Sequence, residues 1–515
     1  MRKLAAILTP LVLWHCAESD IVRVSHVRLT GPIQGAYAPV GFDVGWNDSF
    51  RDSENWDAAW LFIKYRIEKG AWQHATLSTR PQDATVGDDG GIPATFHLSS
   101  DGLGAFVYRA TPGTGRIDWK DLRLRWNYAD DGVPDGSEVD VRVFALEMVY
   151  IPGGVFAVGD GEPVDVRGHL HGLMPGLPFM VTNEDPLTLG GQVIGRVSNN
   201  NGYGMDASFA DDFDENSPVT VPARYPKGST PFFVMKYELT QGSYAAFLNT
   251  LTDEQVQARN PVATVAAVRP GIQRYTVTSV APFSAAIGDR PIHYLAWMDA
   301  AAFADWAALR PMTELEFEKA ARGPIPPQSG EYAWGTNHIA EKRYALTHAE
   351  MPGERVANPG IRTGNASYAS TTGGPEWCWS CLRGPLAGGA FRSDSATREE
   401  SGASYYGVLH LSGNLVERTV TIGNAAGRRF DGQHGDGRLN AAGRAAGPEV
   451  SRWPGSSNTG AASQIIGAVG SGFRGGSWAS PARNLRISDR EFAATPDNSR
   501  QPTFGYRFVR TAPQR

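Results

Sequence analysis

The sequence predicts an all-β part followed by a larger, irregular α+β part. Short alternating segments separated by Gly, Asp and Pro turns fill residues 21–146. Beyond them, glycine-rich strands alternate with a few helical segments, and residues 324–470 form a long Gly-, Ser- and Asn-rich stretch of weak periodicity. At 515 residues the chain is also too long for one ordinary core. We therefore expect two parts that meet near residue 146 and fold separately.

The N-terminus, residues 1–19, has the pattern of an export signal. Two basic residues precede the apolar run 4–14, which is too short to span a bilayer permanently. Two outcomes stay open: cleavage after Ser19, or lipid modification of Cys16 as the first residue of a lipoprotein. Both predict an exported protein in the periplasm, on the outer-membrane surface or outside the cell, with no membrane contact except through a lipid anchor.

Residues 21–146 predict a two-sheet antiparallel sandwich of the immunoglobulin or fibronectin type. The segment AWLFIKYRI alternates, with one face formed by Leu61, Ile63, Tyr65 and Ile67 and the other by Trp60, Phe62, Lys64 and Arg66. The formal net charge is -6, and no dense Lys/Arg stripe occurs. This composition argues against a nucleic-acid partner.

Three helices are predicted in the second part. Thr240 is a suitable N-cap for the first, which continues through QGSYAAFLNTL. The second covers MDAAAFADWAAL. The third begins after Thr313, which has Glu316 at capping-box spacing, and closes at Gly323.

Two of the three cysteines, Cys378 and Cys381, form a C-x-x-C pair. In an exported protein the favoured reading is a disulfide between them, which would hold a loop in place. A metal site and a redox centre stay open. A zinc site needs further ligands, and no histidine has finger-like spacing to the pair. A redox role needs a helix N-terminus, whereas the flanking sequence is typical of loops.

A set of motifs in the second part is more specific than any of these features. MVYIPGGVFAVGDG, PFFVMKYELTQGSYAAFLN, TELEFEKAARG, YAWG, LHLSGNLVERT, FRGGSWASPARNLRISDR and FGYRFVR occur in this order. Together they resemble the formylglycine-generating enzyme family, also called the sulfatase-modifying factor family. The resemblance implies an irregular α+β domain of the C-type lectin-like kind over residues 147–512.

The resemblance also implies where the chain departs from the enzymes of this family. Those enzymes oxidise a substrate cysteine with O2, using copper held by two cysteines near the C-terminus. Aligned on TPD and FGYRF, these positions fall near Arg483 and Ser488, and no cysteine follows Cys381. Because a guanidinium and a hydroxyl cannot replace two thiolates at copper, no copper is expected. A branch of the family that uses non-haem iron takes histidines from a helical domain, and no such domain precedes this one.

Calcium is the cation that the resemblance still implies. In the family the turn that here reads LSGNLVERT holds Ca²⁺ through oxygen ligands, which this ion prefers. By position, the side-chain ligand is Glu417, and the backbone carbonyls lie near His410, Gly413 and Leu415. The aromatic residues usual on either side of the glutamate are missing. The alternative is that Glu417 is a buried ion-pair partner of an arginine.

The C-terminal strands offer a possible groove for an acidic ligand. Its candidate residues are Arg474, Trp478, Arg483, Ser488, Arg490 and Arg507. Structural salt bridges are the alternative for the arginines, and Trp478 also suits the core. The sequence contains no recognisable constellation of an acid–base pair or a nucleophile.

Two hypotheses of function follow. The first is an exported or surface-anchored binding or scaffolding protein whose partner is a protein or a glycan, with no catalytic residues. The second is a divergent metal-dependent oxidoreductase of the sulfatase-modifying factor and non-haem iron superfamily. Formylglycine-generating activity is not expected in either case.

Overall fold

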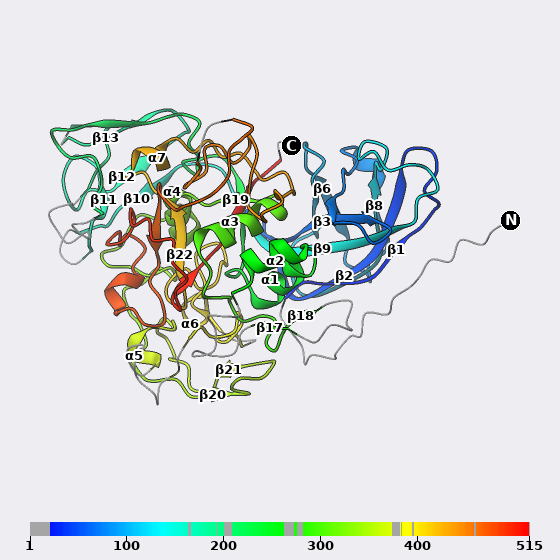
Figure 1. Ribbon diagram of the computed structural model, residues 1–515. Helices are drawn as coiled ribbons and strands as arrows, with labels where there is room; N and C mark the ends of the chain where they lie inside the picture. The colour runs from blue at the N-terminus through cyan, green and yellow to red at the C-terminus, as the bar shows by residue number, and fades with distance from the viewer. Residues whose placement is uncertain are drawn as a thin grey trace.

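The structure is a computed structural model (Figure 1). It describes residues 21–513 except 163–165, 192, 200–208, 262–271, 275–281, 373–381, 383, 394–395 and 458–459. The long strands are β1 (Arg23–Leu29), β2 (Ala38–Arg51), β3 (Asp57–Ile67), β5 (Ala84–Asp88), β6 (Ala94–Leu98), β7 (Ala105–Arg109), β8 (Gly113–Trp126), β9 (Val139–Ile151) and β22 (Val416–Val420).

The remaining elements are short. The other strands are β4 (Gln73–His74), β10 (Phe156–Val158), β11 (Leu170–His171), β12 (Phe179–Val181), β13 (Leu187–Leu189), β14 (Ser198–Asn199), β15 (Val219–Val221), β16 (Phe232–Met235), β17 (Ile272–Arg274), β18 (Phe283–Ala285), β19 (Arg310–Pro311), β20 (Leu346–Thr347), β21 (Arg355–Val356), β23 (Ser471–Arg474), β24 (Phe504–Gly505) and β25 (Phe508–Thr511). The α-helices are α1 (Gln241–Leu248), α2 (Asp253–Arg259), α3 (Trp297–Trp306), α4 (Glu314–Arg322), α5 (Ala369–Thr372), α6 (Arg398–Ser401) and α7 (Ala425–Arg428).

The N-terminal part consists of antiparallel strands with a shared apolar core. A four-stranded sheet has the order β1-β2-β8-β5. Its inward side chains pack against those of β3, β7 and β9 in one buried cluster. Within this cluster Trp46 and Trp119 meet edge to face with ring centroids 5.4 Å apart. The predicted all-β character of residues 21–146 is confirmed.

The second sheet continues from the N-terminal part into the C-terminal part. It has eight strands, in the order β19-β25-β16-β9-β3-β7-β6 with β4 paired to β3. Strand β9 pairs with β3 through Val139–Val149 and with β16 through Met148–Ile151. The expected boundary near residue 146 therefore falls inside a strand. Backbone hydrogen bonds of β9 join the two parts, which argues against their folding separately.

Strand β3 is buried on both faces, as its alternation allows. Leu61 and Ile63 point into the N-terminal core, whereas Trp60 and Phe62 belong to the core of the C-terminal part. Trp60 donates its indole N–H to the carbonyl of Ala307, at 2.9 Å. The C-terminal part thus packs directly on the sheet.

The predicted helices are confirmed, together with their capping residues. The hydroxyl of Thr240 accepts from the backbone N–H of Ser243 at the start of α1. Thr313 and Glu316 form the reciprocal capping box of α4, and Gly323 ends this helix with a φ of 74°. Around these helices the C-terminal part is mostly short strands and loops, so the coarse α+β prediction holds. Within the described residues, no helix is both long and apolar enough to cross a membrane.

Candidate functional site

The predicted calcium turn, residues 410–417, is buried and tightly wound. His410, Gly413 and Asn414 have φ angles of 62°, 91° and 69°. A Cβ at Gly413 would lie 2.6 Å from the carbonyl oxygen of Ser367, so this position requires glycine. The Asn414 side chain accepts from Leu386 N–H at 2.8 Å and donates to Glu238 Oε2 at 2.8 Å. These contacts fix the turn from both sides.

Glu417 is the second residue of β22, the strand after this turn, and only one of its carboxylate oxygens is bonded. Its Oε1 accepts from Nε of Arg507 at 2.9 Å and lies 2.8 Å from Nη2 of the same ion-paired side chain. Its Oε2 is buried and has no hydrogen-bond partner among the residues that the structure describes. The second carboxylate of the cluster, Glu238, accepts from Leu415 N–H at 2.9 Å. Burial, followed by the charge of Glu417, raises the pKa of Glu238 well above its usual value.

This cluster has the chemistry that a hard cation needs. Two buried carboxylates face one guanidinium, and one carboxylate oxygen lacks a partner. A cation at Glu417 Oε2 would supply that partner and lower the cost of burying the second negative charge. The pairing of Glu417 Oε1 with Arg507 fits the ion-pair alternative, and calcium at this residue stays a prediction.

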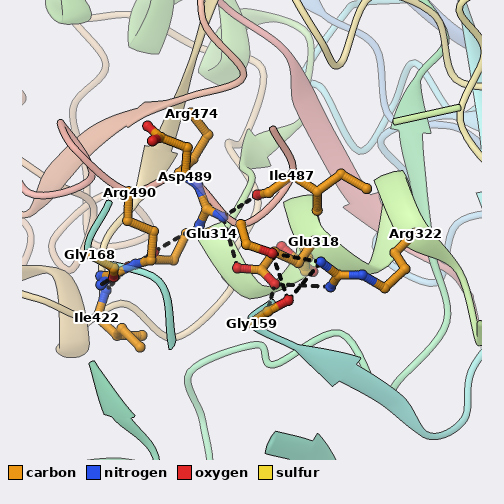
Figure 2. A network of polar contacts seen from close by, with 12 residues as sticks. Gly159, Gly168, Glu314, Glu318, Arg322, Ile422, Arg474, Ile487, Asp489 and Arg490 are labelled. Atoms are coloured by element: carbon orange, nitrogen blue, oxygen red, sulfur yellow. Dashed lines mark hydrogen bonds and ion pairs between the residues drawn. The ribbon is translucent and has the colours of Figure 1, made fainter. Parts of the chain in front are cut away.

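Two of the candidate groove arginines lie in the interior and are paired with carboxylates of α4. Arg474 contacts Glu314 at 3.0 Å and Glu318 at 2.8 Å (Figure 2). Arg490 contacts Glu314 at 2.6 Å and Asp211 at 2.7 Å. Burial alone would raise the pKa of Glu314, but the two arginines outweigh it and the pKa is lowered. This geometry favours the structural alternative, buried ion pairs, for both arginines.

Arg507 and Trp478, two other groove candidates, are also buried. Arg507 donates to Glu417 and to the carbonyls of Met235 and Leu409. Trp478 is fully buried and donates to the carbonyl of Pro502. The polar atoms of both side chains are therefore used in hydrogen bonds inside the protein.

The two positions that align with the copper thiolates have different environments, one buried and one exposed. Ser488 is fully buried; it donates to Gly159 O at 2.6 Å and accepts from Arg322 Nη2 at 2.8 Å. Arg483 is exposed on the surface, 3.9 Å from Glu491. Cys378, Cys381 and Cys16 lie outside the described residues, so the disulfide and the lipid anchor stay predictions.

A carboxylate cluster that sequence reasoning missed lies at the junction of the two parts. Asp305, Asp436 and Glu449 each place a carboxylate oxygen within 4.8 Å of the others. Burial raises the pKa of Glu449 to about 7 and that of Asp305 well above its usual value. The sequence feature that could have indicated this cluster is Lys64, a lone lysine in an apolar strand. Its buried Nζ donates to the carbonyls of Trp306 and Gly437, at 2.7 and 2.6 Å. Burial lowers the pKa of Lys64 well below its usual value, and the charges of Asp305 and Asp436 oppose this shift.

Beside this cluster is a cavity of about 280 Å³, which we call the junction cavity. The N-terminal part supplies one side and the C-terminal part the other. Its lining residues are Ala71, Trp72, Gln73, Thr250, Leu251, Gln255, Trp306, Gly437, Arg438 and Leu439. Sequence reasoning missed it because these segments meet only in the folded chain.

One comparison with known proteins gives a match. The family model of the sulfatase-modifying factor enzyme 1-like domain matches residues 140–512. Its start lies one residue inside β9 (Val139–Ile151), the strand that joins the two parts. No curated protein matches the chain.

Proposed function

Since this chain belongs to the sulfatase-modifying factor family, we propose that it is an exported or surface-anchored binding or scaffolding protein that uses the family domain without copper chemistry. One observation carries the proposal. At the position aligned with a copper thiolate, Ser488 is fully buried and bonded to Gly159 and Arg322. A copper site requires two soft thiolates that can also receive the thiolate of the substrate. A hydroxyl already engaged in the interior offers neither the donor atom nor the access.

The proposal includes the finer features of the fold and its ion. We infer a C-type lectin-like arrangement of the family domain and an immunoglobulin- or fibronectin-like sandwich before it. Ca²⁺ is the proposed cofactor, held by Glu417 with backbone carbonyls of His410, Gly413 and Leu415. The orphaned Oε2 of Glu417 supports this assignment. The ion would stabilise the conformation of the turn.

The proposed location is the periplasm, the outer-membrane surface or the outside of the cell, after removal or lipidation of the N-terminal segment. A disulfide between Cys378 and Cys381 fits an oxidising compartment. The proposed partner is a protein or a glycan. Cell fractionation and mass spectrometry of the mature N-terminus test the location directly.

The test of function uses the purified full-length protein. It is supplied with Cu(I), O2 and a peptide that carries a sulfatase-type cysteine, and the peptide mass is followed. We expect no conversion, and we expect metal analysis to find calcium without stoichiometric copper or iron. Turnover of the peptide would overturn the proposal in favour of the metal-dependent oxidoreductase. Loss of that turnover in Cys378→Ser would place its chemistry at the cysteine pair.

A further inference from the structure

We propose that the carboxylates of Asp305, Asp436 and Glu449 bind one calcium ion beside the junction cavity. This site shares no residue with the calcium turn at Glu417, and it goes beyond the proposed function because it depends neither on copper chemistry nor on a partner. It is carried by the spacing of the three carboxylates, by a buried carboxylate oxygen without a donor, and by the lack of a contacting cation among the described residues.

The three carboxylates come from two segments that meet only in the folded chain. Asp305 lies in the last turn of α3 and is fully buried, whereas Asp436 and Glu449 lie in the loop between α7 and β23 and are partly exposed. One carboxylate oxygen of each residue lies within 4.8 Å of the others. Because Ca–O distances are about 2.3–2.6 Å, oxygens on opposite sides of one ion are roughly 4.6–5.2 Å apart. The spacing therefore accommodates one Ca²⁺, and the irregular loop suits its flexible coordination better than the strict octahedron of Mg²⁺.

Asp305 gathers the loop that carries the other two carboxylates. Its Oδ1 accepts from the N–H of Asp436 at 3.0 Å, and its Oδ2 accepts from the N–H of Ala446 at 3.3 Å. Its backbone carbonyl accepts from the N–H of Gly437 at 2.9 Å. A carboxylate has about four lone-pair sites, so two N–H donors leave both oxygens able to bind an ion. The loop is thus held against α3 before an ion arrives.

Glu449 contributes an oxygen that the protein groups leave unsatisfied. Its Oε1 is buried and accepts from no donor among the residues that the structure describes. The loop folds closely over this carboxylate, since a Cβ at Gly447 would lie 2.3 Å from Oε1 and 2.5 Å from Oε2. A buried carboxylate oxygen without a hydrogen bond is costly, and a cation would supply the missing partner.

The negative charge of the cluster is not balanced by a contacting cation. None of the three carboxylates makes an ion pair with a residue that the structure describes. Lys64 donates to two backbone carbonyls instead, and its charge acts on Asp305 and Asp436 without a contact. The charge of exposed Arg438 acts on Asp436 in the same way. Two such charges lower the affinity for a cation, so we expect a Kd of about 0.1–1 mM, as in extracellular calcium modules.

Calcium bound here would fix one wall of the junction cavity. Gly437 and Arg438 line this cavity and directly follow Asp436. Between α7 and β23 the described residues form isolated bridges and no longer strand or helix. Loops of this length inside a compact domain are usually functional. An ion that joins α3 to both ends of residues 436–449 would hold this loop in one conformation.

Calorimetric titration of the chelator-treated full-length protein with CaCl2 measures this binding in wild type and in single variants. Asp436→Asn and Glu449→Gln keep the size of each side chain and should each weaken the site at least about tenfold. Arg438→Gln removes a nearby positive charge and should tighten calcium binding at low salt. Glu254→Gln, at an exposed glutamate of α2 next to the cavity-lining Gln255, is the matched control and should change nothing.

Glu417→Gln separates this ion from the one proposed at the calcium turn. The effects of Asp436→Asn and Glu449→Gln should be the same with and without that substitution, because the two sites share no residue. Unchanged calcium binding by both variants would overturn the inference, and so would weaker binding by Arg438→Gln. Circular dichroism and melting without calcium separate lost binding from lost folding, and if Asp436→Asn fails to fold, Glu449→Gln decides alone. Turnover of the cysteine peptide would reject the proposed function but leave this test standing.

Discussion

The substitution Glu147→Gln should remove a pH dependence of the protein's stability, because Glu147 is a buried titratable group in the eight-stranded sheet that joins the two parts. Glu147 on β9 is buried beside Asp57 and Lys236, with 2.6 Å between its Oε1 and Lys236 Nζ and 3.1 Å between Lys236 Nζ and Asp57 Oδ2. Asp57 also accepts from Ser49 and from the N–H of Phe50. Within the described residues Glu147 Oε2 accepts from no donor, and the neighbouring carboxylate is that of Asp57. One ammonium thus faces two carboxylates, and Glu147 is the one that keeps a proton.

The sign follows from the direction of the shift. Burial raises the pKa of Glu147 from 4.5 to about 8, against the opposing effect of Lys236. Between these two values the folded state holds a proton that the unfolded state has lost. The free energy of unfolding therefore falls as pH rises from about 4.5 to about 8. At 1.36 kcal/mol per unit the upper limit is about 5 kcal/mol, and relaxation around Lys236 reduces our expectation to about 2 kcal/mol.

Denaturant unfolding at several pH values between 5 and 8 measures this effect. Glu147→Gln mimics the protonated acid and keeps an acceptor for Lys236. Its stability relative to wild type should rise with pH and be greater by about 2 kcal/mol at pH 8. Glu138→Gln, an exposed glutamate just before β9, should stay within about 0.5 kcal/mol of wild type throughout. A difference between Glu147→Gln and wild type that does not change with pH would refute the reasoning.

Four further outcomes are expected. Arg490→Gln should lower the free energy of unfolding by about 3–5 kcal/mol, because buried Asp211 loses its arginine and buried Glu314 keeps only Arg474; thermal melting checks this against exposed Arg483→Gln, which should change little. Thr313→Ala should cost about 1 kcal/mol through loss of the N-cap of α4, by the same measurement. Added Ca²⁺ should raise the melting temperature of chelator-treated protein, and an equal rise in Glu417→Gln would contradict the assignment of this residue. A chain of residues 147–515 should aggregate, because it lacks β3 and half of β9; a monomeric, cooperatively melting product in gel filtration and calorimetry would show that the C-terminal part folds alone.

Local signals in the sequence predicted the local structure well. Thr313 and Glu316 satisfy backbone groups within one helical turn, so their spacing alone identifies the helix start. The alternation of β3 likewise assigned each side chain to one face. The segments that cover those faces could not be predicted, because Trp60 bonds to Ala307, which lies 247 residues away in the sequence. Alternation predicts that two faces differ and does not identify what covers them.

The candidate site shows the same limit for charged groups. The turn at Glu417 was placed by its motif, and its carboxylate was expected to meet either a cation or an arginine. Its partner Arg507 is 90 residues away, and Glu238, which shares the cluster, lies in a different segment. Lys64 reaches Gly437 across 373 residues. Such contacts depend on the tertiary arrangement, since nothing in the local sequence selects one carboxylate or carbonyl over another.

The shared sheet also bears on how the junction cavity works. Trp72 lies between β3 and β4 in the N-terminal part, whereas Arg438 comes from a loop of the C-terminal part. Lys64 on β3 holds the carbonyl of Gly437, next to Arg438. Strand β3, which leads into the N-terminal wall, therefore also holds the C-terminal wall through Lys64. An N-terminal part that swung freely would have to be ordered on binding, at a cost in affinity. The N-terminal part thus supplies three of the ten residues that line the junction cavity, and the family domain without it would lack that wall.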